Sequence, residues 1–427
     1  MKIPPNPRTM DRYPVILAAT SGRLSGVDVF SFNLVRGLNR AGLPAEIVRT
    51  MPFGHAPDPL PFPADIRASD LPVRRKESWS VRWKAMISYL EDRSPCIYIP
   101  NYDWDHSCVS PVLSDAVGIV GIVHSDDPVH YEHVNRLGKY WNKIVAVSPT
   151  IARKVLDQNK EFASKLVVIP YGIDVPAQIP EKQSGINNTL KIVYAGRIVQ
   201  EQKRVMDIPR ILDILAARGV PFAMTVVGGG ADEQEFLRAC APHLEAGRLD
   251  FKGILANHEV LDLFERSDVF ILTSAYEGLP VSLLEAMGRG CVPVVTAIES
   301  GVPDVITDGA NGFTLGIGDI SAFADRLESL QRDPPAPAHI GFRAYETIKN
   351  GEYTVERMSE HYRSVFEELW GEVRAGTYRR PAGRILAPKY LVLRSYIPGF
   401  IKAIVAFLIR AGKRLWRRIQ NSPKARD

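Results

Sequence analysis

The sequence is poor in cysteine and lacks the spacings in which cysteine carries chemistry. Its four cysteines are far apart in the chain and none belongs to a CxxC pair. This pattern is typical of neither a disulfide framework nor a zinc site, and it fits a reducing compartment. The N-terminal residues also lack a long apolar segment before the first expected strand. We therefore expect no signal peptide and a cytoplasmic protein.

Acidic residues are almost missing from the C-terminal part of the chain. From Tyr378 to Asp427 there are thirteen Lys or Arg and one acid, although the whole chain carries 53 basic and 48 acidic residues. The rest of the protein is therefore mildly acidic, and we expect no nucleic-acid partner. The strongly basic tail needs a separate explanation.

The tail has no apolar run long enough to cross a membrane. Its longest uninterrupted apolar stretch is 403–409, far shorter than the roughly 20 residues that a spanning helix needs. On a helical wheel, residues 399–420 separate an apolar side from a basic side. This pattern indicates a helix that lies in an anionic membrane surface, so we expect peripheral membrane association. A helix packed on the protein's own acidic surface is the alternative.

The body of the chain alternates apolar runs with amphipathic stretches. Runs such as "PVILAAT", "VGIVGIVHS", "LKIVYAG" and "VFILTS" are apolar throughout, which is typical of parallel strands covered on both faces. The alternation breaks at 175–189, a stretch rich in Pro, Gly and Asn, and then restarts. We therefore predict an α/β protein with two Rossmann-like domains facing a cleft. The predicted parts are an N-terminal domain (1–175), a C-terminal domain (190–355), a helix returning to the first domain (356–376) and the basic tail (377–427).

Two glutamates bracket the start of a short apolar helix in "YEGLPVSLLEAMGRGCVPVV". Glu277 precedes a helix whose first turn contains Pro280, Glu285 lies inside it, and Gly290 closes it. The backbone at this helix start is a candidate phosphate site, and carboxylates are good acceptors for sugar hydroxyls. We interpret the pair as holding a sugar and a ribose on either side of a diphosphate. The loop residues assigned to the phosphate are Gly278, Leu279, Pro280, Val281 and Ser282.

Simpler interpretations of the glutamate pair remain open. Glu277 could interact only with the helix dipole while Glu285 sits on a solvated face. A glycosidase pair is less favoured, because eight residues separate the two backbones by up to roughly 12 Å. Glycosidase carboxyl groups lie about 5 to 9.5 Å apart.

Other loops that follow strands carry polar residues suited to the same ligand. Arg197 and Lys203 follow "LKIVYAG" and could neutralise a diphosphate. Gly26 opens a helix after "PVILAAT" and permits close approach of a ligand, while His124 follows the strand "VGIVGIV". An exposed basic loop and a structural histidine are the plainer alternatives. The pair Asp103 and Asp105 resembles a metal motif, but one DxD is close to chance, and we expect no metal.

Taken together, these motifs resemble the retaining nucleotide-sugar glycosyltransferases of family 4, which have the GT-B fold. The resemblance covers residues 13–370 and is carried by "EGLPVSLLEAMGRGCVPVV", "YAGRIVQEQKR", "VVIPYGIDV", "GIVHSDDP" and "SGVPDVITDGANGF". It implies that Glu277 and His124 contact the donor sugar, that Glu285 contacts the ribose, and that Arg197 and Lys203 bind the diphosphate. Gly26 corresponds to the glycine of the first loop. The sequence departs from the family in having Ser25 before Gly26, and in an Arg-to-Lys spacing one residue longer than in many members.

The resemblance implies a retaining hexosyltransferase that takes a nucleoside diphosphate sugar as co-substrate and needs no further cofactor. The expected partners are the nucleotide-sugar donor, a sugar or lipid-linked hydroxyl acceptor, and an anionic membrane surface. Polysaccharide, lipopolysaccharide or glycolipid synthesis is the expected role. The alternatives are a nucleotide-sugar epimerase or hydrolase on the same fold, and a catalytically silent nucleotide-binding scaffold at a membrane.

Overall fold

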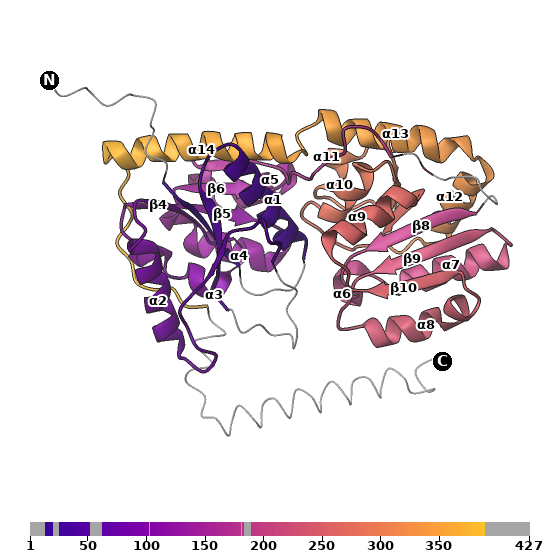
Figure 1. The fold of residues 1–427 in the computed structure, drawn as a ribbon, viewed down its shortest axis with the longest axis horizontal. Helices are drawn as coiled ribbons and strands as arrows, with labels where there is room; N and C mark the ends of the chain where they lie inside the picture. Colours follow the sequence, from indigo (N-terminus) through magenta and orange to yellow (C-terminus); the bar gives the residue numbers. More distant parts are fainter. Residues whose placement is uncertain are drawn as a thin grey trace.

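The structure is a computed structural model that describes residues 13–19, 25–51, 62–101, 103–180, 182 and 189–388. The described residues form two α/β domains side by side (Figure 1). Each domain is built on a sheet whose strand pairs are all parallel. The predicted fold class is therefore confirmed.

The first domain contains, in its described part, a sheet in the order β3-β2-β1-β4-β5-β6-β7. Its strands are fully buried along β1, β4, β5 and β6, as expected for strands covered by helices on both faces. The strands are β1 (Val15–Ala19), β2 (Ala45–Arg49), β3 (Ala68–Asp70), β4 (Cys96–Ile99), β5 (Val117–Val123), β6 (Lys143–Ala146) and β7 (Leu166–Val168). The helices are α1 (Gly26–Arg40), α2 (Trp79–Glu91), α3 (Trp104–Ser107), α4 (Pro128–Leu137) and α5 (Pro149–Gln158), with short 3₁₀ turns η1 (Ser110–Val112), η2 (Gly138–Tyr140) and η3 (Lys160–Phe162).

The second domain repeats this plan with the sheet order β10-β9-β8-β11-β12-β13 over its described residues. Its strands are β8 (Leu190–Ala195), β9 (Phe222–Val227), β10 (Leu249–Gly253), β11 (Val269–Leu272), β12 (Val292–Thr296) and β13 (Phe313–Leu315). Its helices are α6 (Gln200–Lys203), α7 (Asp207–Ala217), α8 (Glu233–Glu245), α9 (Asn257–Arg266), α10 (Val281–Met287), α11 (Val302–Val305), α12 (Ile320–Arg332) and α13 (Pro335–Asn350).

Two stretches of chain cross between the domains, and they bond to each other. The Ile173 N–H donates to the Tyr353 carbonyl at 2.8 Å, and the Val355 N–H donates to the Ile173 carbonyl at 3.1 Å. The approach is close, since a Cβ added to Gly172 would lie 2.4 Å from the Thr354 carbonyl oxygen. The two crossings therefore form one two-stranded connection rather than two independent linkers.

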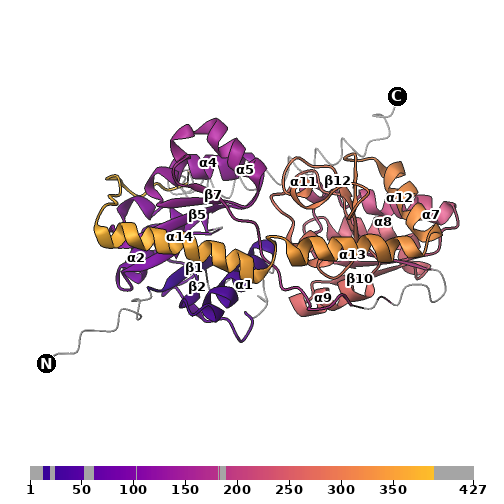
Figure 2. The same cartoon turned by 90° about the horizontal axis from the view of Figure 1, so that it is seen from above.

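After the second crossing, α14 (Val355–Ala375) runs back over the first domain (Figures 1 and 2). Its buried face packs on α1 and β5, where glycines leave room for it. A Cβ on Gly118 would lie 2.3 Å from Leu369 Cδ2, and one on Gly37 would lie 1.8 Å from Ser359 Oγ. Lys143 of β6 donates to Glu368 of α14 at 2.5 Å. The first domain thus includes a helix contributed from beyond the second.

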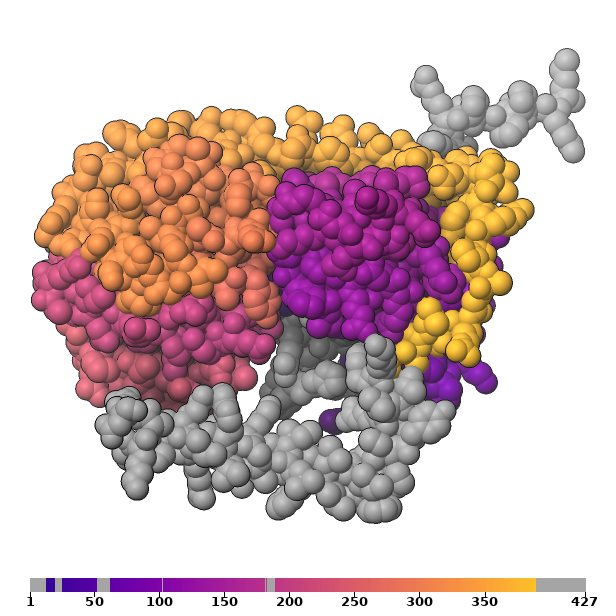
Figure 3. Space-filling view, turned by 180° about the vertical axis from the view of Figure 1, so that it is seen from behind, coloured from indigo at the N-terminus to yellow at the C-terminus, as the bar shows by residue number. Residues whose placement is uncertain are grey.

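Residues 377–388 continue along the side of the first domain, where they appear in yellow in the space-filling view (Figure 3). Arg380 anchors them, because its guanidinium donates to the carbonyls of Leu113, Ser114, Val117 and Tyr140. The Leu386 N–H donates to the Cys108 carbonyl at 3.0 Å. The amphipathic stretch 399–420 lies outside the described residues. In the part of the chain that the structure describes, no helix combines the length and apolar character needed to cross a membrane.

The α1–α14 packing predicts opposite effects for two Gly-to-Ala changes in helices. Gly37→Ala should destabilise the protein by about 1–3 kcal/mol, because the added methyl group meets Ser359 and Val355. Gly371→Ala in α14 should stabilise it by about 0.5–1 kcal/mol, because no atom lies within 4 Å of the added Cβ and alanine favours a helix. Denaturant titrations of the two variants measure both changes in the free energy of unfolding. Ser359→Gly should partly rescue Gly37→Ala, and equal effects of the two alanines would contradict the packing.

Candidate active site between the domains

The two domains meet where the loops that follow β5 and β11 touch. Ser125 and Gly278 form an isolated antiparallel bridge, and the Asp126 N–H donates to the Glu277 carbonyl at 3.4 Å. The main chains are so close that a Cβ added to Gly278 would lie 2.0 Å from the His124 carbonyl oxygen. Glu277 and His124, which are 153 positions apart, therefore sit on opposite sides of one backbone contact.

Polar side chains reinforce this contact. Ser148 and Ser300 pair through their hydroxyl groups at 2.9 Å, and both are buried. Lys154 of α5 donates to Asp126 at 2.8 Å and to Glu299 of the second domain at 2.9 Å. These bonds join the domains beside the predicted site.

Glu277 is the centre of a hydrogen-bonded group at the carboxyl end of the second sheet. Its Oε1 accepts from Lys203 Nζ at 2.5 Å and from Ser274 Oγ at 2.6 Å. Gln202 Nε2 lies 3.5 Å from the other carboxylate oxygen and donates to the Tyr276 carbonyl at 3.2 Å. The Arg197 guanidinium donates to Gln202 Oε1. The structure thus brings together three predicted residues, namely Arg197, Lys203 and Glu277.

Main-chain bonds hold this group in place. The Tyr194 hydroxyl donates to the Arg197 carbonyl at 2.8 Å. The Thr273 hydroxyl at the end of β11 donates to the Lys203 carbonyl at 2.8 Å, and the Ala275 N–H donates to the Gln202 carbonyl at 2.8 Å. The one-turn helix α6 is therefore tied by hydrogen bonds to the loop that carries Glu277.

The helix after Glu277 differs in detail from the sequence prediction. It runs from Val281 to Met287, with Pro280 at the N-cap and Gly288 at the C-cap, so Gly290 lies beyond its end. Pro280 lacks an N–H, so the predicted row of N–H groups from Gly278 to Ser282 is interrupted at the N-cap. A Cβ on Gly26, the first residue of α1, would lie 3.4 Å from Val281 Cγ2. The starts of α1 and α10 therefore face each other across the interface.

Glu285 is buried in α10, and its side chain accepts from Asn257 Nδ2 at 2.8 Å. Burial raises the pKa of its carboxyl group to about 7, while the Asn257 bond and the nearby Arg289 charge oppose this rise. Asn257 lies at the start of α9, just after the loop that follows β10. Sequence analysis did not identify Asn257.

His124 is also buried and uses both ring nitrogens within the protein. Nδ1 lies 2.6 Å from the Tyr171 hydroxyl, and Nε2 lies 2.7 Å from Asn101 Oδ1. Burial holds the pKa of His124 well below its usual value, so the ring is neutral at physiological pH. Neither Asn101 nor Tyr171 was identified as a site residue from the sequence, although Tyr171 lies within the quoted stretch "VVIPYGIDV".

One residue of the DxD pair has a structural role. Asp103 is fully buried, and its carboxylate caps α3 by accepting from the His106 N–H at 3.2 Å. It also bonds to the His106 ring at 3.0 Å. Within the described residues, no group of three or more His, Cys, Asp or Glu side chains is arranged to hold a metal ion.

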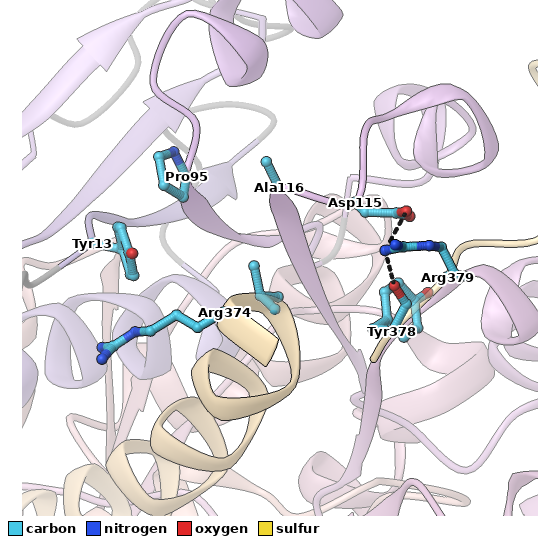
Figure 4. A pocket seen from close by; sticks show the side chains of 8 residues that line it. Tyr13, Pro95, Asp115, Ala116, Arg374, Tyr378 and Arg379 are labelled. Carbon is cyan, nitrogen blue, oxygen red and sulfur yellow. Dashed lines mark hydrogen bonds and ion pairs between the residues drawn. The ribbon is translucent and has the colours of Figure 1, made fainter. Parts of the chain in front are cut away.

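A small pocket of about 250 Å³ lies elsewhere, between the first domain and the end of α14 (Figure 4). Arg379 pairs with Asp115 there at 3.6 Å, and the Arg374 guanidinium lies over the Tyr13 ring. None of the predicted site residues lines it. The lining residues are Tyr13, Pro95, Asp115, Ala116, Val373, Arg374, Tyr378 and Arg379.

Comparison with known proteins finds similarity that is concentrated in the second domain. Residues 178–347 match the model of a family described as glycosyl transferases group 1. The second domain is therefore similar to the group 1 glycosyltransferases. The matched stretch contains Arg197, Lys203, Glu277 and Glu285, and so holds all the predicted site residues of that domain.

Curated relatives show the same similarity to glycosyltransferases over part of their length. The putative colanic acid biosynthesis glycosyltransferase WcaL of Escherichia coli K12 is 27% identical over 193 residues, which are 44% of this chain and 47% of WcaL. The capsular polysaccharide biosynthesis glycosyltransferase CapM of Staphylococcus aureus is 23% identical over 251 residues, 54% of this chain and 63% of CapM. The matched regions thus span about half the length of these relatives.

Solved structures match more of the chain. Anabaena Alr3699/HepE in complex with UDP and glucose matches with a TM-score of 0.67 at 15% identity, covering 83% of this chain and 100% of HepE. At this identity the likeness shows the fold, and it extends over both domains of the GT-B arrangement.

The raised pKa of Glu285 predicts a pH-dependent cost in the unliganded protein. The folded protein binds a proton at Glu285 up to about pH 7, whereas the unfolded chain releases it near the ordinary value of 4.5. Stability should therefore fall by about 3 kcal/mol as the pH rises between these values and then level off. Glu285→Gln should remove this loss, so its melting temperature should exceed that of wild type at pH 8 but not at pH 4.

Thermal melts at the two pH values measure this difference. Glu245→Gln, a change at an exposed glutamate at the end of α8, is the control and should follow wild type at both. A Glu285→Gln variant that is less stable than wild type at pH 8 would contradict a buried, destabilising carboxylate.

Proposed function

We propose that this protein is a retaining glycosyltransferase that moves a sugar from a nucleoside diphosphate sugar to a hydroxyl acceptor. One observation carries the proposal, namely that Arg197, Lys203 and Glu277 meet in a single hydrogen-bonded group. That group lies directly across a backbone contact from the loop that carries His124 of the other domain. Two cations and a carboxylate at this junction suit a substrate with a diphosphate next to a sugar.

Arg197 and Lys203 are assigned to the leaving diphosphate. As the bond from the anomeric carbon to the phosphate oxygen breaks, negative charge develops on the phosphate, and the two cations stabilise it. Without ligand, Lys203 is paired with Glu277 and Arg197 with Gln202. Donor binding then exchanges these internal partners for phosphate oxygens, so no divalent metal is needed in the proposal.

Glu277 is assigned to the donor sugar and Glu285 to the ribose. Ionised carboxylates accept hydrogen bonds from paired hydroxyl groups, and two such bonds favour the charged form. Asn257, which already bonds to Glu285, places the nucleoside beside the start of α9. The UDP and glucose bound to HepE make UDP-glucose the first donor to examine.

Retention follows from departure and attack on the same face of the sugar. In the proposed step, the acceptor oxygen bonds to the anomeric carbon while the bond to phosphate breaks, and the acceptor proton passes to a phosphate oxygen. The products are the glycosylated acceptor and the nucleoside diphosphate. Glu277 positions the sugar in this step and forms no covalent bond. His124 donates a hydrogen bond to a donor hydroxyl group.

The acceptor is proposed to be a sugar chain or lipid-linked sugar at a membrane. WcaL and CapM are named for colanic acid and capsular polysaccharide biosynthesis. The amphipathic basic pattern of 399–420 supports peripheral attachment to an anionic surface. Attachment would place the site near an acceptor held in the bilayer.

A panel of radiolabelled UDP-, GDP- and ADP-sugars, with and without a lipid extract, tests the function. We expect transfer from one donor class, undiminished by EDTA. Arg197→Ala should lower turnover by about two to three orders of magnitude, because its contact strengthens as the leaving group becomes charged. Exposed Arg238→Ala on α8 is the control for loss of a surface cation. A strict Mg²⁺ or Mn²⁺ requirement would contradict the metal-free proposal, and nucleotide binding without any turnover would favour the silent scaffold.

Truncation after Ala375 tests the tail, but it also removes the packed segment 377–388. We therefore propose truncation after Leu386, which keeps the Arg380 anchor. This variant should no longer float with anionic liposomes at low salt, while its calorimetric affinity for nucleotide stays unchanged. High salt should partly reproduce the loss in the full chain, because surface charges are screened. Failure of the full-length protein to float would overturn the membrane proposal.

A further inference from the structure

A chain of hydrogen bonds passes through both ring nitrogens of His124. His124 follows β5, Asn101 follows β4, and Tyr171 lies on the first crossing between the domains. All three side chains are buried, and no ring nitrogen of His124 lacks a partner. The chain thus links the carboxyl ends of two neighbouring strands to the connection between the domains.

The orientation of the Asn101 amide is fixed by its other partners. Its Nδ2 donates to the Ala18 carbonyl at 3.2 Å and to Ser31 Oγ at 2.8 Å. The Ser31 hydroxyl donates its own proton to the Val27 carbonyl at 2.7 Å, so Ser31 Oγ can only accept from Asn101. The opposite amide orientation would set Oδ1 against a carbonyl oxygen. Oδ1 must therefore face His124.

This orientation determines the tautomer of His124. Because Oδ1 has no proton to give, the hydrogen of the 2.7 Å bond must lie on His124 Nε2. The remaining nitrogen, Nδ1, is then an acceptor, and the Tyr171 hydroxyl donates to it at 2.6 Å. The backbone of Asn101 matches this role, since its φ of 54° is one that Asn tolerates better than most residues.

We propose that Asn101 is a positioning residue that sets His124 as an Nε2–H donor for a hydroxyl oxygen of the donor sugar. The inference rests on the proposed function for the identity of the ligand, whereas the tautomer stands independently. The sugar hydroxyl oxygen shares the Nε2 hydrogen with Asn101 Oδ1, and no proton moves. Tyr171 holds the other side of the ring, so the arrangement of the crossing segment is coupled to the ring.

The tautomer can be observed directly by ¹⁵N NMR of protein labelled on its nine histidines, with His124→Gln used to assign the signal. In wild type, the His124 proton should reside on Nε2. Asn101→Asp should produce a doubly protonated ring, because a carboxylate at this position favours the imidazolium form. Asn101→Gly keeps the backbone conformation free of strain and should abolish the fixed tautomer. A wild-type proton on Nδ1, or an unchanged tautomer in Asn101→Gly, would overturn the inference.

Kinetic measurements on the Asn101 variants test whether this residue matters for turnover. Turnover of both Asn101 variants should fall on the order of 10- to 100-fold, while the affinity for free nucleoside diphosphate stays within about two-fold of wild type. Asn39→Asp is the matched control, because Asn39 also donates to a backbone carbonyl but lies at the end of α1, away from His124. It should retain wild-type turnover and tautomer.

The NMR and kinetic experiments together distinguish failure of the proposed function from failure of the positioning role. A wild type that is inactive toward every donor would reject the proposed function, but the NMR result would still decide the tautomer. An active wild type with full turnover in both Asn101 variants would reject the positioning role alone. Equal losses in Asn39→Asp and the Asn101 variants would show a general effect on stability and would also reject it.

Discussion

The backbone contact between Gly278 and His124 is the constraint on which the candidate site depends. No side chain fits at position 278, because its Cβ would lie 2.0 Å from the His124 carbonyl oxygen. The main chain at Gly301 approaches Gly278 equally closely, since a Cβ on Gly301 would lie 2.1 Å from the Gly278 carbonyl oxygen. Three main chains therefore pack without intervening side chains. Glu277, one residue away, is placed by this packing as much as by its own hydrogen bonds.

The charged groups of the site are paired with other residues or buried within the protein. Lys203 neutralises Glu277, Gln202 occupies Arg197, and the pKa of Glu285 is raised to about 7 by burial. Each of these groups is paired within the protein or buried, and burial of an ionisable group costs free energy. A ligand that carries both phosphate and hydroxyl groups offers every one of them a better partner, which ties the proposed specificity to both ends of the donor.

The sequence predicted the elements that repeat a pattern. The apolar strands, the helix that Gly26 opens and the two-domain plan were all predicted from the alternation of apolar and amphipathic stretches. It also predicted Glu277 and Glu285, because their spacing brackets a helix start. It missed β3 and β13, three-residue edge strands that are too short to show alternation.

The missed residues of the site share a physical reason. Gln202, Asn257, Asn101 and Tyr171 each hydrogen-bond to a predicted site residue. These neutral side chains carry no charge signal, since their positions are set by tertiary approach. Predicting them requires the arrangement of the strands in both sheets, which the sequence alone does not specify.

The contacts that hold the domains together are unequal at the two ends of the interface. At one end, the crossings pair through the main chain at Ile173, Tyr353 and Val355, so a relative movement of the domains must pivot there. At the other end, Lys154 joins Asp126 and Glu299 through a partly exposed ion pair, and Ser148 meets Ser300. An ion pair of this kind contributes about 0–1 kcal/mol, and a neutral hydrogen bond contributes about 1 kcal/mol. These polar bonds are therefore much weaker than the covalent connection at the other end of the interface. Under the proposed function, they are the contacts that opening of the interface for a donor has to break, while the two crossings keep the pivot in place.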